Sequence, residues 1–338
     1  MRINNEGRKM MFGIFTKIRN TLYDIGFISQ IDSPYPIISI GNISVGGTGK
    51  TPSTIMIATL LREHGIDVSL LSSGYKRTGK GEIIVLKNNN LLSDISPQLV
   101  GDEVFLHAIT GLYHTVISNQ PKYKSIQSFS STVLIDDGFQ HRKIHRDLDI
   151  VLVNRNDLED RLLPFGRLRE PIHSLNRADI ILCTDDTPEL LIRPFMKQQA
   201  LFARIAFIMG QPYTINGSSI HHNKQDGVMA ISGIANPKRF LETLKNNGFL
   251  IQYHHWYEDH VRFTENDAIN MCKEAAMHSC KTIAITEKDY VKLQAYKHIF
   301  TSHTIQILVI PIIANIIEGK QSFEQVLLSV VSHIQQHS

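Results

Sequence analysis

Short apolar runs alternate with longer amphipathic stretches along most of the chain. Runs rich in β-branched residues at 37–40, 68–71, 132–135, 150–153 and 180–183 predict buried parallel strands, because strands covered by helices on both faces are apolar throughout. An apolar helical pattern from Thr51 to Leu61, closed by Gly65, predicts the helix that crosses from the first strand to the second. This pattern is typical of an α/β protein.

A shorter series of the same kind occupies the second half of the chain. Between the two series, residues 203–227 show short alternating segments and an Asn216-Gly217 turn, which is typical of a hairpin. We therefore expect a larger α/β/α unit at 28–205, a hairpin-like β linker at 206–227, and a smaller α/β unit at 228–338 that contributes to an active-site cleft. The smaller unit is predicted to contain strands at 228–232, 250–253, 282–286 and 305–310, and helices at 237–247, 264–280 and 323–334.

A glycine-rich segment directly follows the first predicted strand and precedes the first predicted helix. Glycines let backbone N–H groups converge on an anion, and the start of a helix adds a positive dipole end. This layout predicts a phosphate loop in a P-loop NTPase-like fold, in which Lys50 reaches the β- and γ-phosphates and the Thr51 hydroxyl binds Mg²⁺. Ser44 stands where the strict pattern has glycine. The residues expected to bind the nucleotide are Gly46, Gly47, Thr48, Gly49, Lys50 and Thr51.

Carboxylates follow two of the predicted elements. Asp136 and Asp137 come directly after the strand at 132–135, where a Walker B strand presents Mg²⁺-binding acids beside the phosphate loop. Asp102 and Glu103 begin a predicted helix, and acids in a first turn commonly compensate the helix dipole. From position alone, Asp102 therefore stays open between a structural and a catalytic role.

The segment Leu163–Pro171 combines two prolines, a glycine and three charged residues, which predicts a rigid loop. The guanidinium groups of Arg167 and Arg169 suit a phosphorylated substrate. A salt-bridged surface loop is the alternative.

Composition limits the range of functions. The 338 residues carry a net charge of only +3, which without a clustered basic patch gives no support for nucleic-acid binding. The three cysteines lack metal-ligand spacing and favour a reducing compartment. No apolar run approaches the length of a membrane span, and the sequence predicts a cytoplasmic protein. The amphipathic segment within residues 1–27 predicts either a helix in a membrane interface or a helix packed on the protein.

Taken together, the motifs resemble those of the tetraacyldisaccharide 4′-kinase family, and the match covers most of the chain. The resemblance implies an ATP- and Mg²⁺-dependent kinase that phosphorylates the 4′-hydroxyl of a membrane-embedded tetraacyldisaccharide 1-phosphate in lipid A biosynthesis, at the cytoplasmic face of the inner membrane. The motifs that carry it are Ser39–Pro52, Gly101-Asp-Glu103, Asp136-Asp-Gly-Phe-Gln-His141, Arg146-Asp147, Leu163–Pro171, Gly233-Ile234 with Pro237, Asp259-His260 and Thr286-Glu-Lys-Asp289.

The resemblance also implies roles for individual residues. Asp102 and His260 correspond to the family's catalytic pair, and Lys50 supports them at the nucleotide. A carboxylate accepts the proton of the attacking hydroxyl, and a histidine orients that carboxylate. The remaining implied contacts are Thr51, Asp136, Asp137 and Glu170 to Mg²⁺, and Asn42, Tyr75, Gln140, His141, Arg167 and Arg169 to the substrate.

The chain departs from the family pattern at three positions, where Ser73, Val104 and Val261 replace a customary arginine, proline and histidine. The main alternative function is a membrane-associated switch ATPase of the deviant Walker A type. That class has a lysine just before the glycine pair, whereas this chain has Val45.

Overall fold

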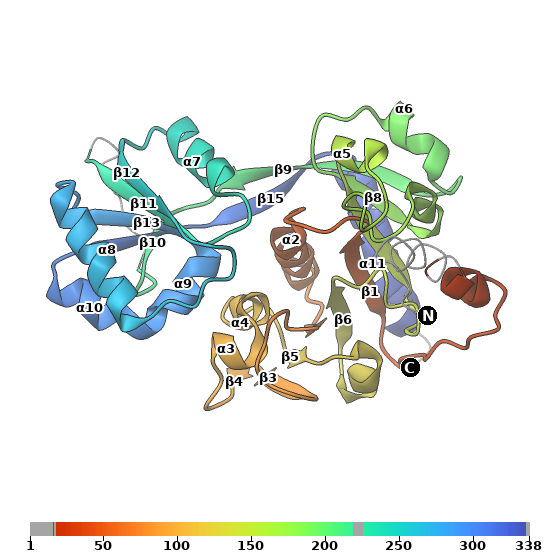
Figure 1. Ribbon diagram of the computed structural model, residues 1–338. Helices are drawn as coiled ribbons and strands as arrows, with labels where there is room; N and C mark the ends of the chain where they lie inside the picture. Colours follow the sequence, from red (N-terminus) through yellow and green to blue (C-terminus); the bar gives the residue numbers. More distant parts are fainter. Residues whose placement is uncertain (1–15, 17, 219–225, 336–338) are drawn as a thin grey trace, which may run out of the picture.

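The protein consists of two lobes, each built on its own β-sheet (Figure 1). The computed structural model describes residue 16, residues 18–218 and residues 226–335. A 10-stranded sheet organises the larger lobe and a 5-stranded sheet the smaller one. Helices and strands alternate along the chain in both lobes, so the predicted α/β class is confirmed.

The large sheet has the strand order β15-β9-β8-β7-β1-β6-β2-β5-β3-β4. Strand β1 lies between β6 and β7 and is parallel to both, so the loop that follows β1 leaves the middle of the sheet. The strands from β9 to β5 in this order are parallel, and antiparallel strands close both edges. Their bounds are β1 (Ile37–Asn42), β2 (Val68–Ser72), β3 (Ile83–Lys87), β4 (Asn90–Leu91), β5 (Thr115–Ser118), β6 (Thr132–Asp136), β7 (Leu148–Val153), β8 (Ile180–Cys183), β9 (Leu201–Met209) and β15 (Ile312–Glu318).

The small sheet has the order β10-β14-β13-β11-β12. Its strands are parallel except for β10, which pairs antiparallel with β14. The predicted strands at 228–232 and 282–286 are confirmed at both ends. The bounds are β10 (Tyr213–Thr214), β11 (Val228–Ser232), β12 (Ile251–Trp256), β13 (Thr282–Thr286) and β14 (Gln306–Ile310).

Helix α2 begins at the phosphate loop and packs on the large sheet, where Ile57, Ala58 and Leu61 join the main apolar core. The α-helices are α2 (Lys50–Glu63), α3 (Pro97–Val100), α4 (Asp102–Ala108), α5 (Arg155–Glu159), α6 (Glu189–Ile192), α7 (Pro237–Asn246), α8 (Glu265–Met277), α9 (Glu287–Leu293), α10 (Lys297–Ser302) and α11 (Lys320–Gln335). Short 3₁₀-helices are η1 (Lys122–Ser128), η2 (Ile172–Arg177), η3 (Arg193–Phe195) and η4 (Gln294–Tyr296).

Two long strands join the lobes. In Figure 1, β9 and β15 run side by side from the large sheet toward the small one, and the two strands pair antiparallel. The chain therefore crosses twice, once at β9 and once when it returns through β15. After the return, α11 places Phe323, Leu327 and Val331 in the core of the large lobe. The expected smaller unit at 228–338 thus differs from the structure, because residues 312–335 belong to the large lobe.

The expected N-terminal helix at 1–27 falls mostly outside the described residues, which exclude 1–15 and 17. Residues 18–24 are helical. Near this helix, Ile18, Ile25 and Phe27 are 51%, 67% and 78% exposed. None of the helices in the described ranges is both long and apolar enough to cross a membrane.

Candidate active site

The phosphate loop connects β1 to α2. All six residues of β1 are buried, and the loop after it reverses through Gly46 and Gly49, whose φ angles are 114° and 90°. Residues other than glycine rarely adopt this left-handed backbone conformation. A Cβ atom on Gly49 would also lie 2.1 Å from the Phe207 ring, so this position requires glycine. The backbone and the start of α2 thus form the cradle that the sequence predicts.

Lys50 is held between the end of β1 and the acidic turn after β6. Its Nζ atom donates to Asn42 Oδ1 at 3.3 Å and lies 3.6 Å from Asp137 Oδ1. The Asn42 amide donates in turn to the Thr48 hydroxyl at 2.9 Å. Asn42, expected to contact the substrate, therefore tethers the phosphate loop and its lysine.

Asp137 is the charged centre of this site. It receives two hydrogen bonds from the Arg169 guanidinium, at 2.7 and 2.8 Å, and Arg169 also contacts the Asn42 side chain. Burial opposes the ionised form of Asp137, but the hydrogen bonds and charges of Arg169 and Lys50 hold its pKa well below the usual range. Asp137 is therefore an anion paired with two cations at the end of the phosphate loop.

Asp136 has a different environment. Its side chain is 2% exposed, and burial raises its pKa to about 6. One carboxylate oxygen, Oδ1, has no hydrogen-bond partner among the described residues, and the other lies 3.9 Å from Nε2 of the buried His107. A buried carboxylate with a free oxygen fits a cation or a cation-bound water. The other candidate metal ligand, Thr51, is buried in the first turn of α2.

A buried lysine, absent from the sequence predictions, supports both acids. Lys122 at the start of η1 is fully buried, and its ammonium donates to the backbone carbonyls of Asp136 and, at 2.8 Å, Asp137. Burial lowers the pKa of Lys122 to about 8. The contact holds a turn in which Asp137 has a φ of 54°. No local pattern marks Lys122, because its partners Asp136 and Asp137 lie at the end of β6 and in the turn after it.

The structure places the two loop arginines apart. Arg169 faces Asp137, whereas Arg167 is 51% exposed and pairs with Asp160 at 2.8 Å within its own loop. Gln140 donates to the backbone carbonyl of Asn42 at 2.9 Å. Burial and nearby cations lower the pKa of His141 to about 3, so its imidazole is neutral at physiological pH.

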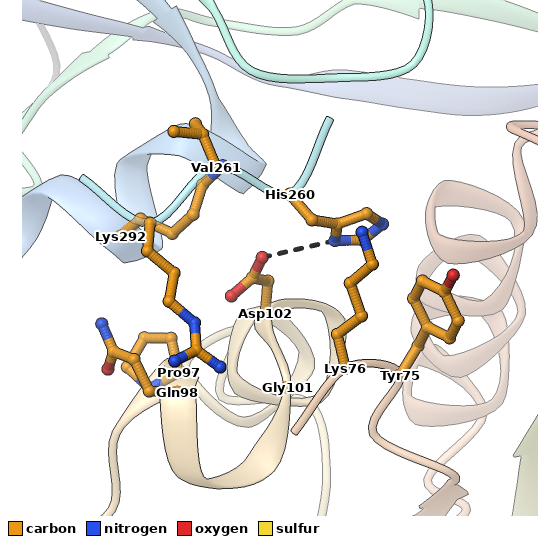
Figure 2. A pocket seen from close by; sticks show the side chains of 10 residues that line it. Tyr75, Lys76, Pro97, Gln98, Gly101, Asp102, His260, Val261 and Lys292 are labelled. Carbon is orange, nitrogen blue, oxygen red and sulfur yellow. Dashed lines mark ion pairs between the residues drawn. The ribbon is translucent and has the colours of Figure 1, made fainter. Parts of the chain in front are cut away.

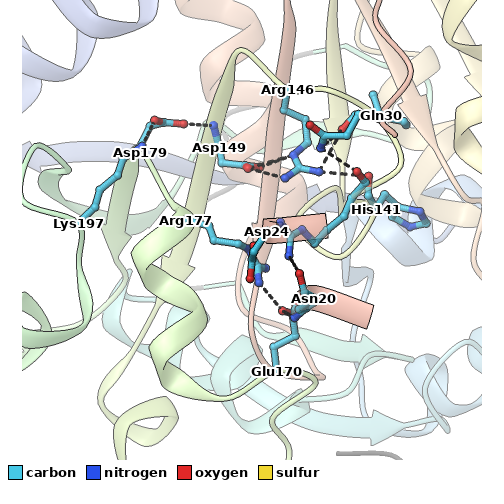
Figure 3. Close-up of polar contacts among 12 residues, drawn as sticks. Asn20, Asp24, Gln30, His141, Arg146, Asp149, Glu170, Arg177, Asp179 and Lys197 are labelled. Carbon is cyan, nitrogen blue, oxygen red and sulfur yellow. Dashed lines mark hydrogen bonds and ion pairs between the residues drawn. The ribbon is translucent and has the colours of Figure 1, made fainter. Parts of the chain in front are cut away.

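Glu170 lies in a separate buried network, away from the contacts of Lys50 and Asp137. Its carboxylate accepts hydrogen bonds from Asn20 at 2.6 Å and Arg177 at 2.8 Å. Figure 3 shows the side chains of Asn20, Glu170 and Arg177 close together, and Asn20 lies on the N-terminal helical segment. The same segment is fixed by Arg142, which donates to the Asn20 carbonyl and to Asp24. Both hydrogen bonds end on Oε2, while Oε1 is buried and has no hydrogen-bond partner among the described residues, so the metal role of Glu170 stays a prediction.

Asp102 and His260 meet across the gap between the lobes. Asp102 opens α4 in the large lobe, and His260 follows β12 in the small lobe, in a turn where its φ is 61°. Asp102 Oδ2 lies 3.6 Å from His260 Nδ1, while Asp259 Oδ2 lies 3.7 Å from Nε2. The Tyr75 ring packs edge-on against the imidazole, with ring centroids 5.2 Å apart. The structure therefore brings together the pair that the resemblance implies.

This pair lines a cavity of about 270 Å³ (Figure 2). In the figure, the side chain of Asp102 at the start of α4 points toward His260 on the opposite loop, and Lys76 and Tyr75 lie beside this pair. Helix α4 also packs against α2, which carries Lys50. Glu103, the residue after Asp102, interacts electrostatically with Lys50. A hydroxyl group entering this cavity would therefore meet a carboxylate on the same turn of α4 that interacts with the phosphate-loop lysine.

Three kinds of comparison place this architecture among known proteins. A family model described as tetraacyldisaccharide-1-P 4′-kinase matches residues 9–332. The tetraacyldisaccharide 4′-kinase of Aquifex aeolicus is 36% identical over 291 residues, covering 83% of this chain and 87% of the relative. The corresponding enzyme of Chlorobaculum tepidum is 33% identical over 297 residues, with 84% of each chain covered.

The fold also matches a solved structure from the same group. The crystal structure of "apo" form LpxK from Aquifex aeolicus in complex with ATP superposes with a TM-score of 0.76 at 30% identity, covering 96% of this chain and 97% of that one. The match extends over both lobes. The chain therefore belongs to the tetraacyldisaccharide-1-phosphate 4′-kinase family.

Proposed function

We propose that the protein transfers the γ-phosphoryl group of ATP to the 4′-hydroxyl of a tetraacyldisaccharide 1-phosphate, the lipid A precursor on which the named relatives act. The observation that carries this proposal is the Asp102–His260 pair, 3.6 Å apart, in a cavity whose α4 wall packs against the helix of the phosphate loop. The site thus offers an acceptor for a hydroxyl proton near a nucleotide cradle.

The nucleotide end of the reaction belongs to the phosphate loop. The backbone from Gly46 to Gly49 binds the phosphates, and Lys50 stabilises the charge that spreads over the transferred group. Asn42 and Asp137 hold the Lys50 ammonium in place. Because Arg169 is bound to Asp137 and Asn42, we assign it to the same positioning group rather than to direct recognition of the sugar.

Thr51, Asp136 and Asp137 are the residues that would hold Mg²⁺. The unpartnered Oδ1 of Asp136 and the hydroxyl of Thr51 suit an ion that commonly binds through one or two protein oxygens and the substrate phosphates. When bound, Mg²⁺ neutralises charge on the β- and γ-phosphates. Glu170 is a further candidate for this set, because Asn20 and Arg177 both donate to its Oε2 atom and its buried Oε1 atom has no hydrogen-bond partner among the described residues.

Asp102 acts as the general base. Its carboxylate takes the proton of the 4′-hydroxyl while the hydroxyl oxygen forms a bond to the γ-phosphorus. The bond between that phosphorus and the bridging oxygen breaks, and ADP leaves. His260 orients the carboxylate from the other lobe.

The substrate reaches this base from the exposed side of the cavity. Tyr75 is 64% exposed beside His260 and offers an aromatic face to a sugar ring. Arg167 is half-exposed and would bind a phosphate group in addition to Asp160, with which its Nε atom is paired. The neutral His141 and its neighbour Gln140 complete the proposed contacts. The exposed Ile18, Ile25 and Phe27 support contact of the N-terminal segment with a membrane surface, which we assign to the cytoplasmic face of the inner membrane.

The test is a lipid kinase assay. Purified protein with Mg²⁺, γ-labelled ATP and a tetraacyldisaccharide 1-phosphate in detergent should yield labelled lipid at the expense of ATP. ATP turnover without labelled lipid would contradict the proposal and favour a switch ATPase.

A further inference from the structure

Two adjacent acids at the start of α4 each contact a residue of the small lobe. Asp102 contacts His260, and Glu103 forms an ion pair and a hydrogen bond with Lys288, the second residue of α9. The function proposed above leaves Lys288 without a role, although it belongs to the Thr286-Glu-Lys-Asp289 motif. Its partner Glu103 stands next to the proposed base.

The motif around Lys288 is fixed to the small lobe on several sides. Thr286 caps α9, because its side chain accepts a hydrogen bond from the Asp289 amide. Asp289 is fully buried, accepts from the Gly233 amide at 3.1 and 3.2 Å, and pairs with Lys292 at 2.9 Å. The turn that carries Lys288 is therefore held rigidly at the end of β11.

The loop that carries His260 rests on the same corner of the small lobe. A Cβ atom on Gly233 would lie 2.6 Å from Val261, the residue after His260. Gly233 is thus in close contact with both the His260 loop and Asp289. Lys288 and His260 consequently belong to one structural corner, and a shift of that corner moves both.

Charge and packing both favour the contact with α4. The side chains of Glu103 and Lys288 are 30% and 35% exposed. Burial opposes ionisation of each group, yet their mutual attraction lowers the pKa of Glu103 and raises that of Lys288. Further along α9, Val291 is buried against the core of the large lobe. Helix α9 is therefore the docking element between the lobes, with the ion pair at its N-terminal end.

We propose that Lys288 is a positioning residue that latches the small lobe onto α4 through Glu103 and so holds His260 against Asp102. The proposal rests on the proposed catalytic role of Asp102 and His260. Loss of the latch would increase the population in which the lobes are separated, because the ion pair exists only in the docked arrangement.

The first measurement is steady-state lipid kinase kinetics. Lys288→Met removes the charge while keeping an unbranched side chain, and we expect kcat to fall about tenfold or more with the KM for ATP within about threefold. Lys288→Arg keeps a cation and should retain most of the activity. The matched control is Lys320→Met, since Lys320 pairs with Glu324 at 3.7 Å inside one lobe and should leave kcat unchanged.

The second measurement follows the lobes directly and needs no turnover. Spin labels on Leu190→Cys in the large lobe and Met277→Cys in the small lobe report the distance between them, because both positions are exposed and the native cysteines are buried. Lys288→Met should broaden the distribution toward longer distances, and Lys288→Arg should not. Glu103→Gln removes the charge on the other side of the contact and should produce the same shift. This second variant keeps the test valid if Lys288→Met folds poorly.

An unchanged distance distribution in both Lys288→Met and Glu103→Gln would overturn the latch, even if kcat fell. If the unmodified protein failed to phosphorylate the lipid, but Lys288→Met and Glu103→Gln still shifted the distance distribution, the latch would be supported and the proposed function contradicted. The two failures are therefore distinguishable.

Discussion

Asp102 Oδ2 lies 3.6 Å from Nδ1 of His260, although the two residues belong to different lobes and different sheets. The contact depends on the way β9 and β15 hold the lobes face to face. In the proposed mechanism the base is complete only when the lobes are docked, so the chemistry would be coupled to lobe position.

The first prediction concerns the base. Asp102→Asn keeps the size of the side chain but removes its ability to accept a proton, and we expect kcat to fall by about 10²-fold or more. The KM for ATP should change by less than about threefold, because the nucleotide contacts lie on the phosphate loop. Asp259→Asn, on the other side of His260, is the matched comparison and should cost less than about fivefold in kcat. Near-wild-type turnover of Asp102→Asn would remove this residue from the base role.

The second prediction concerns Lys122. Lys122→Met leaves the buried carbonyls of Asp136 and Asp137 without their donor, and an unmet buried acceptor costs about 1–3 kcal/mol. We expect a fall of several degrees in Tm and a loss of kinase activity, both measured on purified protein. Lys124→Met, two residues along the same 3₁₀-helix and exposed, is the control. Equal melting temperatures for the two variants would show that the Lys122 contacts are not required.

The third prediction concerns pH. Glu287 accepts a hydrogen bond from the Ile312 amide at the start of β15, and burial raises its pKa from 4.5 to about 7. A carboxyl group with a raised folded-state pKa binds its proton more tightly in the folded protein, so stability decreases as pH rises from about 4.5 to about 7. Glu287→Gln removes this dependence. The difference in Tm, Glu287→Gln minus the unmodified protein, should therefore be a few degrees larger at pH 8 than at pH 5.

The control for this titration is Glu242→Gln, an exposed acid on α7. Its effect on Tm should be the same at both pH values. If Glu287→Gln and Glu242→Gln behaved alike, Glu287 would not be the titrating group.

The fourth prediction concerns the membrane. Replacing Ile18, Ile25 and Phe27 together by serine should reduce flotation of the protein with liposomes by several-fold, because burial of apolar side chains in the interface is lost. The Tm should stay within about two degrees, since the three side chains are largely exposed. Leu190→Ser, which removes an 80% exposed leucine on α6, controls for a general loss of surface hydrophobicity. Unchanged flotation of the triple variant would contradict membrane contact through these side chains and favour a purely structural role of the segment.

Local patterns determined much of the fold. The phosphate loop, the α2 crossover and the buried strands β11 and β13 follow from glycine spacing and runs of β-branched residues, which act over a few neighbouring positions. The strands β5 and β15 were not predicted, and β9 was predicted only in part, as the start of the hairpin-like linker. The two strands of the bridge between the lobes have mixed exposure along their length, so no clean period marks them.

The sequence by itself also indicated candidate residues for the chemistry, from the lysine and threonine of the phosphate loop to the acids after β6 and the histidine after β12. Only the tertiary structure decided how they are grouped. It placed Arg169 on Asp137, buried Lys122 beneath both acids, and turned Glu170 toward Asn20, 150 residues away along the chain. It also joined Glu103 to Lys288, 185 residues apart. Such pairings depend on which strands neighbour each other and where the chain crosses between lobes, and no local spacing encodes either.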